Sequence, residues 1–154
     1  MSLRRVPAGA ERQEYVPLLL LADESEQQVR SYLNQGELYD CRDDDRLIGV
    51  VLSVQHDTNG VELRAVAVEP AAQGQGLGRR MLMDVLDDLR SRGVSRVTVG
   101  TASSAIGPFA FYQKVGFRPL RIERDYFSAA RGYPPGLREN GIPVRDMIWM
   151  EQSL

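Results

Sequence analysis

The sequence has little of several features that mark whole classes of protein. Cys41 is the only cysteine and His56 the only histidine among 154 residues, so no internal disulfide can form and no metal-ligand spacing is present. The longest purely apolar run, residues 18–22, is far shorter than the roughly 20 residues that span a bilayer. The arginines near the N-terminus are not followed by the apolar stretch of a signal peptide. These absences predict a protein without a metal or a membrane segment, and the single cysteine is typical of a reducing cytoplasm.

An excess of positive charge is also missing. The chain has 19 Lys and Arg against 21 Asp and Glu, a formal net charge of −2, and its arginines are scattered rather than clustered. We therefore expect no nucleic-acid partner. Hydrophobic residues make up 43% and charged residues 26%, as in an ordinary soluble globular chain, and the length predicts one domain over residues 1–154.

Hydrophobic periodicity and turn signals predict alternating strands and helices. Asn59-Gly60 is the strongest hairpin signal, and the apolar positions of residues 77–92 repeat at helical spacing. Another helix is expected after Asp23 as its cap, with Glu26 as the partner in a capping box, and Gly36 is expected to end it. This order indicates an α+β fold with a central mixed sheet. Strands are expected at residues 2–6, 37–42, 46–55, 61–68, 94–101, 116–122 and 144–151, further helices at 18–21 and 108–115, and a loop rich in glycine and proline at 128–143.

Three alternating glycines occur in the stretch VEPAAQGQGLGRRML, residues 68–82. Gly74, Gly76 and Gly78 lie between the end of a predicted strand and the start of a predicted helix. A helix start exposes unpaired N–H groups with positive partial charge, and missing Cβ atoms let a phosphate reach them. Arg79 and Arg80 add donors suited to phosphate. The stretch is therefore a candidate pyrophosphate cradle, with a flexible turn that binds nothing as the alternative.

The pattern G-x-G-x-G differs from two familiar phosphate-binding sequences. A dinucleotide fingerprint requires a third glycine where Arg79 stands, and a P-loop requires Gly-Lys followed by Ser or Thr. The preceding strands are also expected to form an antiparallel meander rather than a βαβ unit. Both nucleotide interpretations are disfavoured, although a dinucleotide-dependent oxidoreductase stays an alternative.

Two motifs resemble the signatures of the GNAT N-acetyltransferases. Residues 73–78, QGQGLG, look like the family's Q/R-x-x-G-x-G/A, and residues 111–117, FYQKVGF, are similar to its (L/F)-Y-x-K-x-G-F. One helix and one strand separate the two motifs, as in the family, and the order of predicted elements matches the family fold from end to end. The resemblance implies the GNAT fold, an α+β structure whose central, mostly antiparallel sheet of six to seven strands is flanked by helices.

This resemblance implies acetyl-CoA as the acetyl donor and indicates residues that bind it. The strand end at Val66, Ala67 and Val68 is expected to splay from the following strand and to pair with the pantetheine arm. Ser103 stands near the position where many relatives carry an asparagine that bonds the coenzyme, and a hydroxyl offers one donor where an amide has two. The pyrophosphate is expected on the loop made of Gln73, Gly74, Gln75, Gly76, Leu77, Gly78 and Arg79.

Acetyl transfer requires an acid for the departing thiolate and a base for the attacking amine. Tyr112 holds the place of the family's acid, and a phenol with a pKa of about 10 is protonated at neutral pH. A packed structural tyrosine is the alternative. Glu62 lies on the strand before the glycine loop, where several family members carry a base, and strand periodicity predicts one face for Glu62, Arg64 and Val66. Water as the base is the alternative for Glu62.

The resulting prediction is a cytoplasmic, acetyl-CoA-dependent N-acetyltransferase in which a primary amine attacks directly in a ternary complex. Cys41 lies far from both motifs in the sequence, which argues against an acyl-enzyme. A CoA-binding module of the same fold without turnover is the alternative. The acceptor is expected to be a small-molecule or peptide amine near the first helices and residues 123–143, where Glu123, Asp125 and Tyr126 are found. A homodimer through the C-terminal strand is common in the family, so the resemblance also admits a homodimer here.

Overall fold

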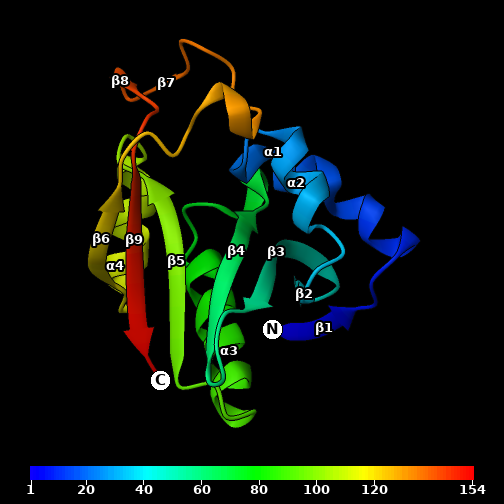
Figure 1. Cartoon of the computed structure of the whole chain (residues 1–154). Helices are drawn as coiled ribbons and strands as arrows, with labels where there is room; N and C mark the ends of the chain where they lie inside the picture. The colour runs from blue at the N-terminus through cyan, green and yellow to red at the C-terminus, as the bar shows by residue number, and fades with distance from the viewer.

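A seven-stranded sheet organises the computed structural model, which describes all residues from 1 to 154 (Figure 1). The strand order is β1-β2-β3-β4-β5-β9-β6, and every neighbouring pair is antiparallel except β4 and β5, which are parallel. This arrangement confirms the expected α+β class with a mixed, mostly antiparallel sheet. The strands are β1 (Ser2–Val6), β2 (Glu37–Asp43), β3 (Arg46–Gln55), β4 (Gly60–Val68), β5 (Arg96–Ala102), β6 (Arg118–Glu123) and β9 (Met147–Ser153).

Helices cover both faces of the sheet (Figure 1). One face carries α1 (Val16–Ala22) and α2 (Glu26–Tyr32), and the other carries α3 (Leu77–Ser91) and α4 (Ile106–Val115). Successive residues of β3 divide between the two layers, because Val51 joins the core under α3 whereas Val50 and Leu52 join the core under α1 and α2. Short 3₁₀ helices occupy η1 (Ala10–Tyr15), η2 (Pro70–Ala72) and η3 (Ala129–Arg131).

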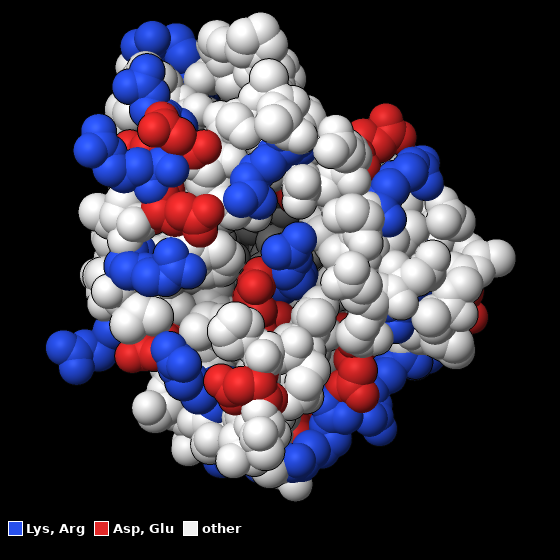
Figure 2. Space-filling model, viewed as in Figure 1, with Lys and Arg blue, Asp and Glu red and all other residues white.

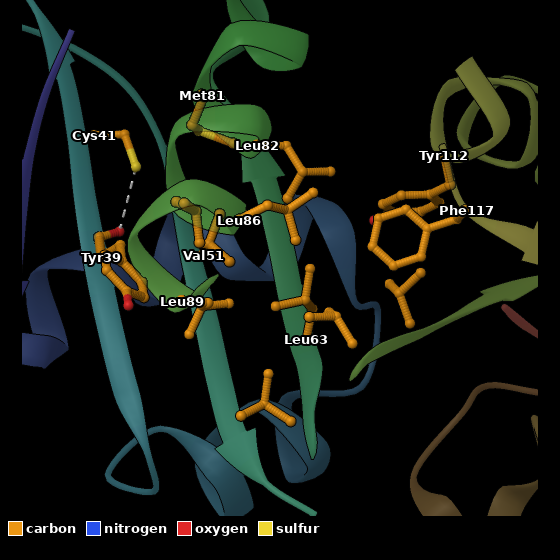
Figure 3. Packing of buried hydrophobic residues seen from close by; sticks show 14 of the residues in the cluster. Tyr39, Cys41, Val51, Leu63, Met81, Leu82, Leu86, Leu89, Tyr112 and Phe117 are labelled. Carbon is orange, nitrogen blue, oxygen red and sulfur yellow. Dashed lines mark hydrogen bonds between the residues drawn. The ribbon is translucent and has the colours of Figure 1, made fainter. Parts of the chain in front are cut away.

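The long helix α3 follows directly from its sequence. Its buried face consists of Met81, Leu82, Val85, Leu86 and Leu89, which recur at helical spacing and pack on the sheet (Figure 3). The glycine that follows the helix has a φ of +88°, the left-handed geometry that favours glycine after a helix end. None of the helices is both long and apolar enough to cross a bilayer.

The parallel strands β4 and β5 separate before either one ends. Gly60–Leu63 of β4 pairs with Arg96–Val99 of β5, although β4 continues to Val68 and β5 to Ala102. On its other edge β4 is paired with β3 from Val61 to Val68, with one irregularity at Arg64. Backbone groups in the second half of β4 that point toward β5 therefore have no ladder partner there. This separation is the splaying that the family resemblance implied.

Three expectations about helix ends and connections are wrong. Asp23 does not cap the second helix, because the N-cap of α2 is Ser25, whose Oγ accepts a hydrogen bond from the Gln28 N–H at 3.2 Å. Asp23 instead accepts the Ser25 N–H at 3.1 Å in the preceding turn. The helix ends at Tyr32 rather than at Gly36. Residues 128–143 are not a simple loop, since they contain η3 and a two-stranded ribbon of β7 (Arg138–Glu139) and β8 (Ile142–Pro143).

Candidate active site

A cavity of about 240 Å³ lies where β4 and β5 separate. Its wall combines these two strands with α4, the turn between α1 and α2, and parts of the segment from Tyr126 to Trp149. Figure 2 shows a hollow near the centre of this face, with acidic and basic atoms at its edge. The separation of two strands thus creates a chamber that residues from the beginning, middle and end of the chain line together.

Tyr112 contributes its side chain to this chamber from α4. The side chain is 8% exposed, and its ring packs edge-on against the rings of Phe111 and Phe117, at centroid distances of 5.4 and 5.8 Å. Figure 3 shows Tyr112 beside Phe117 at the α4 end of the core. The hydroxyl has no hydrogen-bond partner in the chain, and burial alone raises the pKa of Tyr112 above the ordinary value of 10.0. The chamber therefore contains a neutral phenol that is free to donate a hydrogen bond.

Glu62 faces the chamber from β4 and is held by Arg64. The Arg64 Nη1 lies 3.4 Å from the Glu62 Oε2, and the two side chains are 26% and 18% exposed. The Arg64 guanidinium also stacks over the ring of Tyr32 on α2, 5.3 Å from its centroid. Only one carboxylate oxygen of Glu62 has a partner in the chain, so the other is available to accept a proton or a hydrogen bond from a ligand.

A β-bulge at Arg64 changes which face the β4 side chains occupy. The β3 register passes from Ala65 to Leu63, which leaves Arg64 without an opposite residue. Before the bulge Leu63 packs in the α3 core, whereas after it Ala65 packs in the α1 and α2 core, and Val66 packs on the α3 side. The expectation that Glu62 and Val66 share one face is therefore wrong, because the extra residue reverses the alternation between them.

The glycine loop before α3 has the geometry of an open cradle. Gly74 and Gly76 both have a φ of +75°, and a Cβ atom at either position would meet no atom within 4 Å. Gly76 is the N-cap of α3, and no side chain caps the first N–H groups of this helix. Unpaired donors at the helix start therefore face open space, which is the arrangement that suits an anion.

Gly78 has a different reason to be a glycine. A Cβ atom there would lie 3.1 Å from the Val68 Cγ2 and 3.7 Å from the Phe111 Cε1. The missing side chain lets α3 approach both β4 and α4. Alternating glycines alone could not separate this packing role from the conformational role of the other two.

The glutamines of the loop are engaged by the loop itself. The Gln73 Nε2 donates to the Val68 carbonyl at 3.1 Å, and the Gln75 Nε2 donates to the Ala71 carbonyl at 2.8 Å. These bonds fix the shape of the loop and leave its backbone N–H groups to a ligand. Arg79 is exposed in the first turn of α3, where it carries positive charge without an ion-pair partner.

The remaining predicted residues do not all meet in the chamber. Val66 lines it, whereas Ala67 is buried on the opposite face of β4, in the core under α1 and α2. Ser103 lies outside the chamber lining, and its N–H donates to the Asp146 carbonyl at 2.9 Å. Glu123 is engaged elsewhere, since it accepts the Trp149 Nε1–H at 3.1 Å.

Sequence reasoning indicated the regions that form the wall opposite β4 but singled out few of its residues. Its members come from the turn after α1, from α2 and from the segment around β7, and no short motif joins them. All of them except Trp149 lie near the first helices or within residues 123–143, which the sequence had indicated as the acceptor region, but only Tyr126 had been singled out. The chamber-lining residues of this group are Asp23, Glu24, Tyr32, Tyr126, Tyr133, Glu139 and Trp149.

Comparison with known proteins identifies the family. The sequence model of the acetyltransferase (GNAT) family matches residues 7–117. An uncharacterized N-acetyltransferase of Bacillus subtilis strain 168, YvbK, is 36% identical over 149 residues, which make up 96% of this chain and 95% of that protein. The chain therefore belongs to the GNAT acetyltransferase family.

Two solved structures extend this similarity to the fold and the coenzyme. A Bacillus subtilis acetyltransferase in complex with CoA has a TM-score of 0.85 and 33% identity, covering 99% of this chain and 97% of that chain. A GNAT family acetyltransferase from Elizabethkingia anophelis with acetyl-CoA bound has a TM-score of 0.87 and 33% identity, with the same coverage of both chains. The GNAT fold is thus confirmed, and both of these relatives hold the coenzyme.

Proposed function

We propose that this protein transfers an acetyl group from acetyl-CoA to a primary amine, which attacks the thioester directly in a ternary complex. The observation that carries this proposal is the opening between β4 and β5, around which one chamber is built from both layers of the fold. Tyr112 belongs to the layer of α3 and α4, whereas Arg64, the partner of Glu62, stacks on α2. Acetyl-CoA on one side of the opening and the amine on the other can therefore meet between the Tyr112 phenol and the Glu62 carboxylate.

The glycine loop supports acetyl-CoA as the donor. Its open space, its left-handed glycines and the uncapped start of α3 fit a pyrophosphate, to which Arg79 adds positive charge. The backbone of Val66–Val68 has no strand partner on the β5 side, so it is available to bond the amides of the pantetheine arm. The CoA and acetyl-CoA in the two similar structures agree with this assignment.

Glu62 and Tyr112 carry the proton transfers in this proposal. Glu62 accepts the proton of the attacking amine, directly or through a water molecule, as the new C–N bond forms. Tyr112 donates its proton to the sulfur as the C–S bond breaks, so one proton enters and one leaves, and the products are an acetamide and a CoA thiol. A backbone N–H at the open end of β4 stabilises the charge that develops on the carbonyl oxygen.

Cys41 supports direct attack rather than an acyl-enzyme. It is fully buried in the core under α3 and is absent from the chamber lining. Burial raises the pKa of Cys41 to about 12, which keeps it a thiol at neutral pH. No other cysteine is present.

The decisive experiment is a turnover assay with acetyl-CoA and a panel of primary amines, in which release of the CoA thiol and formation of the acetamide are both measured. We expect thiol and acetamide to appear in equal amounts, with intersecting lines in double-reciprocal plots because both substrates must bind before reaction. Parallel lines would contradict direct attack. Tight acetyl-CoA binding without acetamide from any amine would favour a CoA-binding module that does not turn over.

A further inference from the structure

The wall of the chamber carries more negative charge than its own cations balance. Its charged members are four carboxylates, Asp23, Glu24, Glu62 and Glu139, and one guanidinium, Arg64. Arg64 is paired with Glu62 at 3.4 Å. The other three carboxylates have no ion pair within the chain.

These three carboxylates differ in the number of hydrogen bonds that they accept from the rest of the chain. The Asp23 carboxylate already has hydrogen-bond partners within the chain, because it accepts hydrogen bonds from the Tyr133 hydroxyl at 2.9 Å and the Ser25 N–H at 3.1 Å. Glu139 accepts one bond, from the Ser104 Oγ at 3.3 Å. Glu24 accepts none, and burial together with repulsion from Glu139 and Asp23 raises the pKa of Glu24.

Glu24 and Glu139 thus form a pair of like charges in the wall of the chamber. Glu24 belongs to the turn between α1 and α2, and Glu139 to β7, so only the tertiary fold brings them together. Holding like charges near one another without a counter-ion costs free energy, and a bound cation offsets that cost. The side chains are not grouped to hold a metal ion. The aromatic rings of the same chamber suit an organic cation.

Two largely buried tyrosines whose hydroxyls have no partner in the chain are a second and independent sign of a ligand in the same chamber. The side chains of Tyr112 and Tyr126 are 8% and 7% exposed, both line the chamber, and neither hydroxyl has a partner in the chain. A hydroxyl on a side chain that is more than nine-tenths buried normally finds a hydrogen-bond partner. These two are satisfied when a polar molecule occupies the chamber.

Aromatic rings line the same chamber as the acidic pair and the proposed reaction centre. Tyr126 packs edge-on against Trp149 at 6.1 Å, and both line the chamber together with Tyr32, Tyr133 and Phe127. Aromatic faces favour both methylene groups and organic cations. The ring of Tyr32 already carries the Arg64 guanidinium, 5.3 Å from its centroid.

We propose that the acceptor is a small organic dication, with a primary amine beside Glu62 and Tyr112, a second cationic centre between Glu24 and Glu139, and an alkyl chain along the aromatic wall. This inference rests on the proposed function and adds the chemical class of the acceptor. A zwitterionic amino acid fits less well, because its carboxylate would approach the acidic pair. A simple monoamine leaves that pair without a counter-ion.

Three probes with the same six-carbon chain test this inference: 1,6-diaminohexane, hexylamine and 6-aminohexanoate. We expect kcat/KM for the diamine to exceed that for hexylamine roughly ten-fold, since one charged contact is gained, and 6-aminohexanoate to be the poorest. In Glu24→Gln and in Glu139→Gln the ratio of diamine to hexylamine should fall toward one. Glu26→Gln, an exposed change outside the chamber on α2, is the control that should keep the ratio.

The outcomes separate this inference from the proposed function. Acetylation of all three probes at equal kcat/KM, or a diamine preference that survives in both Glu24→Gln and Glu139→Gln, overturns the dication while leaving the N-acetyltransferase intact. If no probe is acetylated, the proposed function fails, and calorimetry with 1,6-diaminohexane on the acetyl-CoA-loaded protein decides the inference. Binding that weakens in Glu24→Gln supports it, and absence of binding to the parent protein overturns it.

Discussion

At the scale of single residues, the environment of Tyr112 matches the requirements of a general acid. Burial alone raises the pKa of this phenol, and no neighbouring charge or hydrogen bond competes for its proton. The proton is therefore retained at least up to the ordinary value of 10.0, so in the proposed mechanism it is available to the thiolate that leaves as the C–S bond breaks.

The substitution Tyr112→Phe should separate catalysis from binding. We expect kcat to fall roughly 100-fold, the lower range for loss of a general acid, with little change in the acetyl-CoA dissociation constant because the ring and its packing remain. Steady-state kinetics and calorimetry measure the two effects. Tyr39→Phe is the matched control, since the Tyr39 hydroxyl bonds Asp88 at 2.7 Å outside the chamber. An unchanged kcat in Tyr112→Phe would remove Tyr112 from the mechanism.

At the scale of elements, the sequence predicted those that depend on local signals. α3 was foreseen because five buried side chains recur at helical spacing, and the β3–β4 hairpin because Asn59-Gly60 is a strong turn signal. The cap of α2 was misassigned because Asp23 and Ser25 are both good capping residues, and only the backbone decides which one is adjacent to the helix.

The β-bulge and the separation of β4 from β5 lie beyond local prediction. Both depend on how β4 pairs with two neighbours at once, and nothing around Arg64 signals an extra residue. The two motifs were enough to indicate Tyr112 and the glycine loop. Glu24 and Glu139 could not be found in the same way, because they come from opposite ends of the chain and meet only through tertiary packing.

A charge placed in the glycine loop should abolish coenzyme binding. We expect Gly76→Glu to weaken acetyl-CoA affinity by about 100-fold or more, because a like charge fills the cradle and about two charge-assisted hydrogen bonds are lost. Gly93→Glu is a close control, because Gly93 also has a positive φ and open space around its Cβ position, but lies at the other end of α3. Both variants should lose stability from backbone strain, by about 1–3 kcal/mol. Calorimetry that shows equal acetyl-CoA affinity in the two variants would contradict the cradle.

The cap of α2 also connects this helix to η3. The Ser25 Oγ accepts the Gln28 N–H and donates to the Arg131 carbonyl of η3 at 2.8 Å, and Ser25 is fully buried. We expect Ser25→Ala to cost about 1–2 kcal/mol of stability and to lower the melting temperature by several degrees. Ser31→Ala on the same helix removes only an exposed bond to the Gln28 carbonyl and should have almost no effect. Equal melting temperatures for the two variants would show that the buried cap contributes nothing.

At the scale of the whole molecule, its tyrosines link stability to alkaline pH. All six, Tyr15, Tyr32, Tyr39, Tyr112, Tyr126 and Tyr133, are buried, and burial is the largest cause that raises the pKa of each above 10.0. Lys114 is the only lysine, so nearly all the basic side chains are arginines, which keep their charge throughout this range. The ion pairs of the arginines therefore persist above pH 10, whereas deprotonation of the phenols in this range favours the unfolded chain.

The expected result is a loss of stability that begins near pH 10. The folded state holds phenol protons that the unfolded state releases from about pH 10 upward, so this contribution is complete below pH 10 and declines as pH rises toward the folded pKa values. Each phenol that stays protonated in the fold lowers the free energy of unfolding by about 1.4 kcal/mol per pH unit.

Urea unfolding at a series of pH values above 10 measures this effect. The free energy of unfolding should fall with pH at a slope equal to the sum of several such phenol contributions. Tyrosinate absorbance should rise together with the loss of structure. Tyr39→Phe should reduce the slope by about one contribution, because it removes one titrating phenol. A gradual rise of tyrosinate absorbance in a protein that stays folded would show that the phenols titrate in the native state, and that their burial does not govern alkaline stability.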